Sequence, residues 1–293
     1  AIYASTREAP VTLGLSLGED GAVYRQWHRR DNNGSVEILR IADEKVTVES
    51  VPGTETSYYG SESLSFSSVS LRGRDVYRCR PEENFGFCKH RPDGKPIFLG
   101  GSPSISSPIL LKQRAIFGGL DGKLHVVPLN GKGTPWSYKT PFGKAITAPV
   151  AVCNGRVYFG CDDGYLYVLG PNGSASPPTQ DLELSEIRSP FRSPLAAPEY
   201  DWFTSFGNLS NTNSNRQGLQ PPLKLKWIRR FKGTCKHFSV CGDGRMYTHT
   251  AEGQIFAVEQ ETGRLLWRRY FPGVHISFTS PLYHAGRLYV PQA

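Results

Sequence analysis

The 293-residue sequence lacks long apolar runs, adjacent cysteines and the cysteine–histidine spacing of zinc sites. No stretch approaches the roughly 20 apolar residues of a membrane helix, so we expect no membrane span. Neither a Gly-x-Ser-x-Gly motif nor the acidic spacing of an EF-hand occurs, which argues against a serine hydrolase and an EF-hand calcium site. Only 20 % of the residues are charged, and the net charge of +8 permits an acidic partner without indicating one.

Cysteine is sparse but even in number, which fits an exported protein in an oxidising compartment. Cys79 and Cys88 flank RPEENFGF, and Cys235 and Cys241 flank KHFSV, so either pair can be drawn as a disulfide across a small loop. Buried free thiols are the alternative for these four and for the two others, Cys153 and Cys161. The sequence leaves both alternatives open.

Repetition is what the sequence does contain. Segments 108–136, 149–173 and 235–267 can be laid over one another, and Trp227 and Trp267 are 40 residues apart. A period of roughly 40 to 45 residues with about four short strands per unit is typical of a β-propeller blade. The 31 glycines and 22 prolines also favour many tight turns over a helical bundle.

One unit shows why its residues form strands and turns. RVYFG (156–160) and YLYVL (165–169) are rich in β-branched and aromatic residues, which suit a half-buried pleated surface. Gly122, Gly164 and Gly253 stand in the turns between such strands, at positions that require positive φ. The sequence therefore predicts an all-β propeller of four-stranded antiparallel blades.

The run GQIFAVEQETGRLLW (253–267) resembles the PQQ repeat of quinoprotein-dehydrogenase-like propellers, in which a Thr-Gly turn is followed by tryptophan. The resemblance implies that Trp136, Trp227 and Trp267 pack between neighbouring blades. It also implies a complete ring of seven or eight blades. Enzymes, assembly scaffolds and sensors share this repeat, so the resemblance is informative about fold and poor for function.

The chain divides into three parts on this basis. Residues 1–173 hold propeller repeats, the first part degenerate, and 223–293 hold further repeats with an incomplete last blade. Residues 174–222 form a Pro/Ser/Asn-rich connection laid over the surface, or a linker between two propellers; we favour a single propeller with a long excursion. About five and a half blades are present, so we expect an additional chain or a protein partner to complete the ring.

Enzymes with this repeat oxidise alcohols or sugars with PQQ and Ca²⁺. Their paired adjacent cysteines are absent and their calcium ligands cannot be matched, so we predict no cofactor, no metal site and no catalytic residue. PQQ and Ca²⁺ remain the alternative. If a ligand site lines the channel, the candidate residues are Arg78, Asp162, His237, His249 and His275, although a hydrogen-bonded strand histidine is the simpler interpretation of each histidine.

The basic runs RQWHRRD (25–31) and KLKWIRRFKGTCKH (224–237) combine charge with aromatic residues. Alternation in KLKWIRRF favours a half-buried outer strand over a nucleic-acid site, so we expect no nucleic-acid partner. We interpret the chain as a non-catalytic binding or scaffold propeller, periplasmic or secreted, similar in repeat to outer-membrane assembly-factor propellers. The alternatives are a quinoprotein oxidoreductase whose site lies mostly outside this sequence, and a carbohydrate-binding or sensory propeller.

Overall fold

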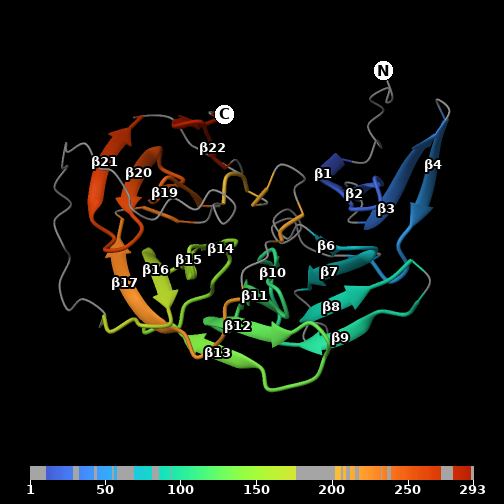
Figure 1. The fold of residues 1–293 in the computed structure, drawn as a ribbon, viewed down its shortest axis with the longest axis horizontal. Coiled ribbons are helices and arrows are strands. Elements are labelled where there is room, and N and C mark those ends of the chain that lie inside the picture. The colour runs from blue at the N-terminus through green and yellow to red at the C-terminus, as the bar shows by residue number, and fades with distance from the viewer. Residues whose placement is uncertain are drawn as a thin grey trace.

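A computed structural model provides the coordinates. It describes residues 11–28, 33–42, 45–54, 56–57, 69–80, 86–92, 94–175, 202–205, 207–208, 212–214, 218–231, 233–235, 239–271 and 280–291. Within these ranges the chain forms only strands and turns, arranged as six antiparallel sheets around a hub (Figure 1). The predicted all-β propeller is confirmed.

The sheets follow one another in chain order and are called blades 1 to 6. Blade 1 contains β1 (Val11–Leu17), β2 (Val23–His28), β3 (Asn33–Ala42), β4 (Lys45–Ser50) and β5 (Thr56–Ser57), which pairs with β3. Blade 2 contains β6 (Ser70–Arg72), β7 (Asp75–Cys79), β8 (Phe87–His90) and β9 (Ile97–Gly100). Blade 3 contains β10 (Ile109–Leu110), β11 (Arg114–Gly118), β12 (Lys123–Pro128) and β13 (Trp136–Lys139).

The remaining blades repeat the same order of strands. Blade 4 contains β14 (Ala151–Cys153), β15 (Arg156–Gly160), β16 (Tyr165–Gly170) and β17 (Lys224–Arg230). Blade 5 contains β18 (Val240–Gly242), β19 (Arg245–His249), β20 (Gln254–Glu259) and β21 (Leu265–Tyr270), and blade 6 contains β22 (Leu282–His284) and β23 (Arg287–Tyr289). The three segments predicted as repeats thus fall in blades 3, 4 and 5, which are successive.

Blade 4 is built from two distant parts of the chain. Strand β17 pairs with β16, with Trp227 opposite Val168 and a register shift next to that pair. The connection between residues 174 and 222 therefore joins the third and fourth strands of one blade.

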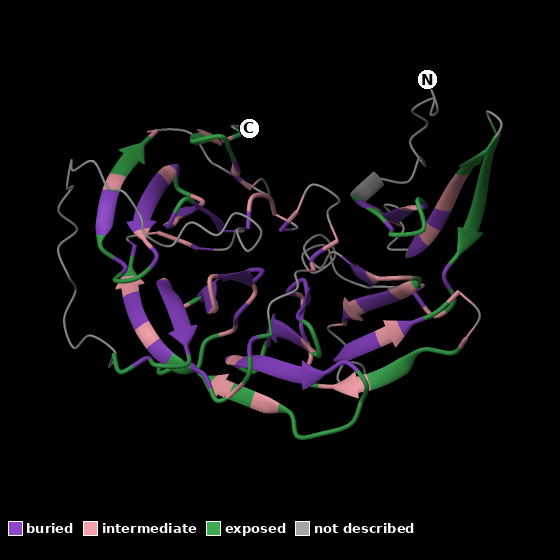
Figure 2. Ribbon diagram, viewed as in Figure 1, coloured by how far each residue is buried: buried purple, intermediate pink, exposed green. Residues whose placement is uncertain are grey.

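Apolar clusters join each blade to the next. Tyr24 and Ile38 of blade 1 pack with Val76 of blade 2, and the rings of Phe87 and Phe117 stack at 5.4 Å between blades 2 and 3. One large cluster runs through blades 3, 4 and 5, and a smaller one joins blades 5 and 6. Figure 2 shows these buried residues along the middle strands, whereas the outer strand β4 is exposed along its length. Face-to-face burial between successive sheets therefore holds the ring together.

The turns have the backbone conformation that the sequence predicts. Gly122, Gly164 and Gly253 have φ values of 76°, 82° and 85°. The first hairpins of blades 4 and 5 close on Asn154–Gly155 and Asp243–Gly244, in which both central residues have positive φ. Two central residues with positive φ form the turn that matches the twist of paired strands.

Of the two alternatives for the cysteines, this structure has the buried thiols, because none of the six cysteines forms a disulfide and all six are buried. Cys79 lies opposite Phe87, and Cys88 lies opposite Arg78. Because neighbouring positions along a strand point to opposite faces, the Cys79 and Cys88 side chains are on different sides of blade 2. Cys235 lies beside Gly160 of blade 4, and Cys241 belongs to β18 of blade 5.

Candidate functional site

The candidate channel residues are distributed over several blades. Arg78 of blade 2 donates a hydrogen bond from Nη1 to the carbonyl oxygen of Thr54 at 2.9 Å. Asp162 of blade 4 accepts one from the Thr147 hydroxyl at 2.8 Å, and His249 of blade 5 is fully buried at the end of β19. Arg78 and Asp162 thus have different hydrogen-bond partners, and a ligand site that they share stays a prediction. His237 and His275 lie outside the described residues.

The hub contains part of the 174–222 connection. Trp202 is fully buried, and its backbone exchanges two hydrogen bonds with Cys241, of 2.7 and 3.1 Å, along the inner strand of blade 5. The carbonyl oxygen of Phe203 accepts a bond of 3.0 Å from the Tyr283 amide of blade 6. This part of the connection therefore runs along the inner strands of blades 5 and 6.

Residues 212–214 occupy the opposite side of the hub. The carbonyl oxygens of Thr212 and Asn213 accept hydrogen bonds from the amides of Leu71 and Leu110, at 3.1 and 2.9 Å. The fully buried Asn213 has a φ of 51° and donates from Nδ2 to the carbonyl oxygen of Val69 at 3.1 Å. The connection thus contacts the inner strands of four blades.

The interpretation of this connection as a surface segment is wrong for residues 202–205 and 212–214. Because these residues satisfy backbone groups of the inner strands, they belong to the interior of the ring, whereas Gly218, Gln220 and Pro222 are exposed. The signal in the sequence was Trp202, a large aromatic residue in a polar stretch that no periodic pattern explains.

A pocket of about 650 Å³ opens beside this segment, and we call it the hub pocket. It lies where the first hairpin turns of blades 1, 2 and 3 meet Asn208, Thr212 and Ser214. Its lining combines leucines, two cations, one carboxylate and several hydroxyl and amide groups; these residues are Leu17, Gly18, Glu19, Leu71, Arg72, Gly73, Lys112, Asn208, Thr212 and Ser214. The mixture of apolar walls and a few polar groups is typical of ligand pockets.

Blade 1 has one face that packs on blade 2 and one that does not. In the register of β1 to β4, the second face carries five large apolar side chains with high exposure: Leu15 (49 %), Leu17 (47 %), Ile41 (71 %), Val46 (50 %) and Val48 (55 %). We call this surface the open face. Figure 1 places blade 1 at the opening of the ring, across from blade 6, with no described strand between them.

An ion pair sits among these apolar residues. Arg25 lies opposite both Leu15 and Glu37 in the sheet, and its Nε donates a 3.0 Å hydrogen bond to Glu37. The two side chains are only 10 % and 13 % exposed. A paired and shielded charge leaves the open face apolar in character.

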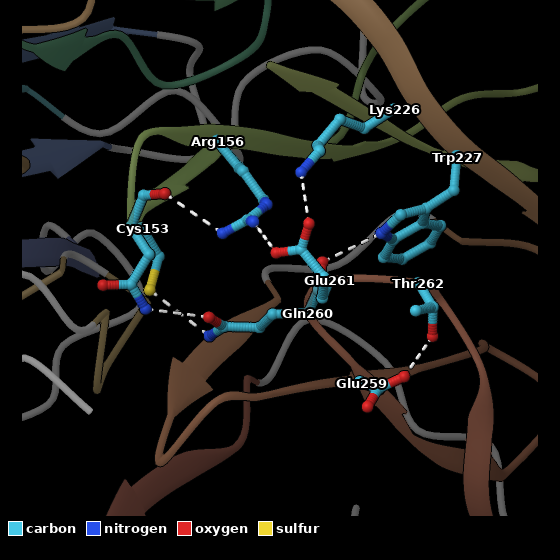
Figure 3. Close-up of polar contacts among 9 residues, drawn as sticks. Cys153, Arg156, Lys226, Trp227, Glu259, Gln260, Glu261 and Thr262 are labelled. Carbon is cyan, nitrogen blue, oxygen red and sulfur yellow. Dashed lines mark hydrogen bonds and ion pairs between the residues drawn. The ribbon is translucent and has the colours of Figure 1, made fainter. Parts of the chain in front are cut away.

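The contact between blades 4 and 5 shows what the repeat tryptophan does. In Figure 3 the turn after β20 lies against the outer strand of blade 4. Trp227 donates from Nε1 to the carbonyl oxygen of Gln260 at 2.9 Å, and the Glu261 carboxylate pairs with Arg156 and Lys226. Trp227 thus packs between two blades. Trp136 is partly buried against the main core, and Trp267 lies 6.0 Å from the ring of Tyr247.

The Gln260 side chain extends the same contact toward the inner strands. Its Oε1 accepts a 2.8 Å hydrogen bond from Asn154, and its Nε2 lies 3.3 Å from the Cys153 sulfur and 3.0 Å from the Arg245 carbonyl oxygen. Every polar atom of this fully buried amide is therefore engaged, and its role is to join blades rather than to bind a ligand.

Ser102, His125 and Asp121 form a serine–histidine–aspartate cluster on blade 3. Nε2 of His125 lies 3.0 Å from both the Ser102 hydroxyl and the Asp121 carboxylate. Burial acts to raise the pKa of Asp121, but hydrogen bonds from His125, Ser102 and the Lys123 amide outweigh it and hold that pKa below its usual value. A relay needs the two oxygens on different ring nitrogens, so this cluster cannot act as a catalytic triad.

Two further features, a metal site and a membrane span, were sought in the part of the chain that the structure describes. No group of three or more His, Cys, Asp or Glu side chains is placed there to hold a metal ion. No helix among those residues is long and apolar enough to span a membrane.

Comparisons with known proteins identify the fold of the chain but no sequence family. No protein-family model matches the sequence, and no curated protein matches it. Solved structures that resemble the chain include BamB from Moraxella catarrhalis (TM-score 0.55, 12 % identity, 94 % of this chain), the WD40 β-propeller domain of Doa1 (0.52, 12 %, 93 %) and Sqt1 from Saccharomyces cerevisiae (0.55, 9 %, 91 %).

The chain spans 66 % of the BamB chain, 73 % of the Doa1 domain and 62 % of Sqt1. At 9–12 % identity these likenesses concern the fold alone. The chain is thus similar to β-propellers, and it spans about two thirds of the length of BamB and of Sqt1.

Proposed function

We propose that this chain is a non-catalytic binding and scaffold propeller of an exported, periplasmic or secreted protein with PQQ-like repeats, and that it docks a protein partner on the open face of blade 1. The observation that carries the proposal is the set of five exposed apolar residues on one face of one sheet. Contiguous apolar surface of this kind marks interaction sites in proteins.

The occupant that fits the open face is a β-sheet of another chain. Each described pair of successive blades meets through apolar sheet faces, and the open face is the corresponding surface of blade 1 on its other side. A flat apolar sheet face buries its side chains best against another sheet at about 10 Å. Each of these side chains is about half exposed or more, so a partner sheet would remove further apolar area from water at every one of the five positions.

Two observations support binding over catalysis. The hub contains residues 202–205 and 212–214 of the connection, and the Ser102–His125–Asp121 cluster lacks the arrangement of a relay. A PQQ- and Ca²⁺-dependent oxidoreductase remains the alternative, and dye reduction in the presence of added PQQ and Ca²⁺ would establish it in place of the scaffold.

Site-specific photo-crosslinking tests the docking surface. We would place p-benzoylphenylalanine at Val46 on the open face and, as a control, at Phe98, which is 54 % exposed on β9 of blade 2. We expect one adduct of defined mass from position 46 and none from position 98. The crosslinked segment of the captured protein should be a β-strand. Loss of the adduct in an Ile41→Glu, Val48→Glu background would support it. Equal adducts from both positions, or none from position 46, would refute it.

A further inference from the structure

We propose that the hub pocket binds an extended acidic peptide, with a carboxylate at Lys112 and apolar side chains against Leu17 and Leu71. This inference does not rest on the partner sheet proposed for the open face, although Leu17 lies at the border of both surfaces. It rests on the walls of the pocket, on its charges and on its hydroxyl groups.

One wall of the pocket holds the Arg72 guanidinium in a fixed position. Arg72, in the first hairpin of blade 2, donates from Nη1 to the carbonyl oxygen of Lys112 at 3.0 Å and from Nη2 to that of Leu111 at 2.6 Å. These two bonds tie the hairpin of blade 3 to that of blade 2, so the pocket is pre-formed on this side. A pre-formed site binds without the entropic cost of ordering its walls.

The charge of the pocket favours an anion. Arg72 and Lys112 contribute two positive charges to the lining against the single carboxylate of Glu19. The Lys112 side chain is exposed, and the described contacts of that residue involve its backbone carbonyl oxygen. Its ammonium group can therefore meet a ligand carboxylate in a charge-assisted hydrogen bond.

The hydroxyl groups add donors on the facing wall. Asn208 donates from Nδ2 to the Thr212 hydroxyl oxygen at 2.7 Å and to the Ser214 carbonyl oxygen at 3.0 Å. Because Thr212 Oγ1 accepts that bond, its own proton is directed elsewhere and can reach a ligand oxygen. Donors on one side and cations on the other match the carbonyl and carboxylate oxygens of an acidic peptide.

The apolar wall distinguishes a peptide from a small inorganic anion. Leu71 is buried beneath the pocket, and Leu17 is 47 % exposed at its edge. Phosphate and sulfate have no apolar group that could pack against these leucines, whereas a peptide can place apolar side chains there between its acidic residues. A volume of about 650 Å³ also matches the range of roughly 300 to 1,000 Å³ typical of organic ligands.

Fluorescence anisotropy with two labelled hexapeptides tests the proposal. One alternates leucine with glutamate, and the other replaces each glutamate by glutamine. We expect saturable binding of the glutamate peptide that weakens with salt, and binding of the glutamine peptide that is at least about tenfold weaker.

Two lysine variants separate the pocket from the general positive charge. Lys112→Ala should weaken binding about tenfold, whereas Lys132→Ala, which removes an exposed lysine from another turn of blade 3, should change it less than about twofold. Glu19→Gln should tighten binding, because it removes the carboxylate that opposes the ligand. Equal effects of both lysine variants, equal binding of both peptides, or no saturable binding would each overturn the proposal, and none of these results bears on crosslinking at Val46.

Discussion

Trp227 of blade 4 donates its indole N–H to the carbonyl oxygen of Gln260 in blade 5, at 2.9 Å. Gly263, three residues further on, lies against the face of the same ring, so that a Cβ built on it would come within 2.5 Å of the ring atoms. The Thr-Gly turn of one blade and the tryptophan of the preceding blade are thus complementary surfaces. This contact joins blade 4 to blade 5 at the repeat tryptophan.

Gly263→Ala should destabilise the protein strongly. Gly263 has a φ of 69° and has no space for a Cβ, so the substitution adds a clash with Trp227 to the cost of a left-handed conformation. We expect a loss of roughly 3 kcal/mol in the free energy of urea unfolding. Gly155→Ala is the matched control, because Gly155 has a φ of 68° but nothing lies within 4 Å of a Cβ built on it. This substitution should lower the free energy of unfolding by only about 1 kcal/mol. Equal losses would contradict the close packing on Trp227.

Asn213→Ala tests whether the connection stabilises the hub. The substitution removes the hydrogen bond to the Val69 carbonyl oxygen and places alanine at a φ of 51°. We expect a loss of roughly 2 to 4 kcal/mol, whereas Asn213→Gly, which tolerates this φ, should lose about half as much. Urea unfolding followed by tryptophan fluorescence measures both. Two variants as stable as the unsubstituted protein would mean that the segment does not hold the inner strands.

His90 should make stability depend on pH. Burial, together with the positive charges of Arg78 and Arg80, lowers the pKa of this fully buried side chain to about 4. Unfolded histidine titrates near 6.5, so below that pH the unfolded state binds a proton that the folded state does not. Stability is therefore lost as the pH falls from about 6.5 to about 4, and roughly 2 kcal/mol of it between pH 7 and pH 5.

Urea unfolding at those two pH values measures this loss. His90→Leu should reduce the difference between pH 7 and pH 5, and the control His284→Gln, at an exposed position, should leave it unchanged. A pH dependence that persists in His90→Leu would assign the effect to other groups.

The thiols should be unreactive until the protein unfolds. All six cysteines are free and buried, and burial raises the pKa of Cys161 and of Cys235 to about 12 each. Because the thiolate is the reactive form, Ellman's reagent should detect almost no thiol in the native protein and six after unfolding without reductant. Four or two thiols after unfolding would restore the disulfide interpretation.

The repeat made most of the fold predictable. A periodic pattern contains local features, such as the strand-forming run 156–160, the turn residue Gly164 and the spacing of the tryptophans. These features could therefore be recognised from the sequence. The hub segment was not predictable in this way, because Thr212 and Asn213 bond to Leu71 and Leu110, which are more than a hundred residues away. Pairing over such distances leaves no period in the sequence.

The candidate channel residues also depend on long-range structure. Arg78, Asp162 and His249 lie in three different blades, so only the packing of the blades decides whether they share a site, and that site stays a prediction. Cys79 and Cys88 are close in sequence, and only the register of β7 and β8 shows that they face apart. The open face likewise depends on the pairing of four strands, which sets Leu15, Leu17, Ile41, Val46 and Val48 on one side.

The most direct measurement of partner docking is a crystal structure of the chain bound to the protein captured from position 46. We expect a β-sheet of that protein packed face to face on blade 1, with Leu15, Ile41 and Val48 buried in the contact. A partner bound elsewhere, with these three side chains still exposed to solvent, would contradict it.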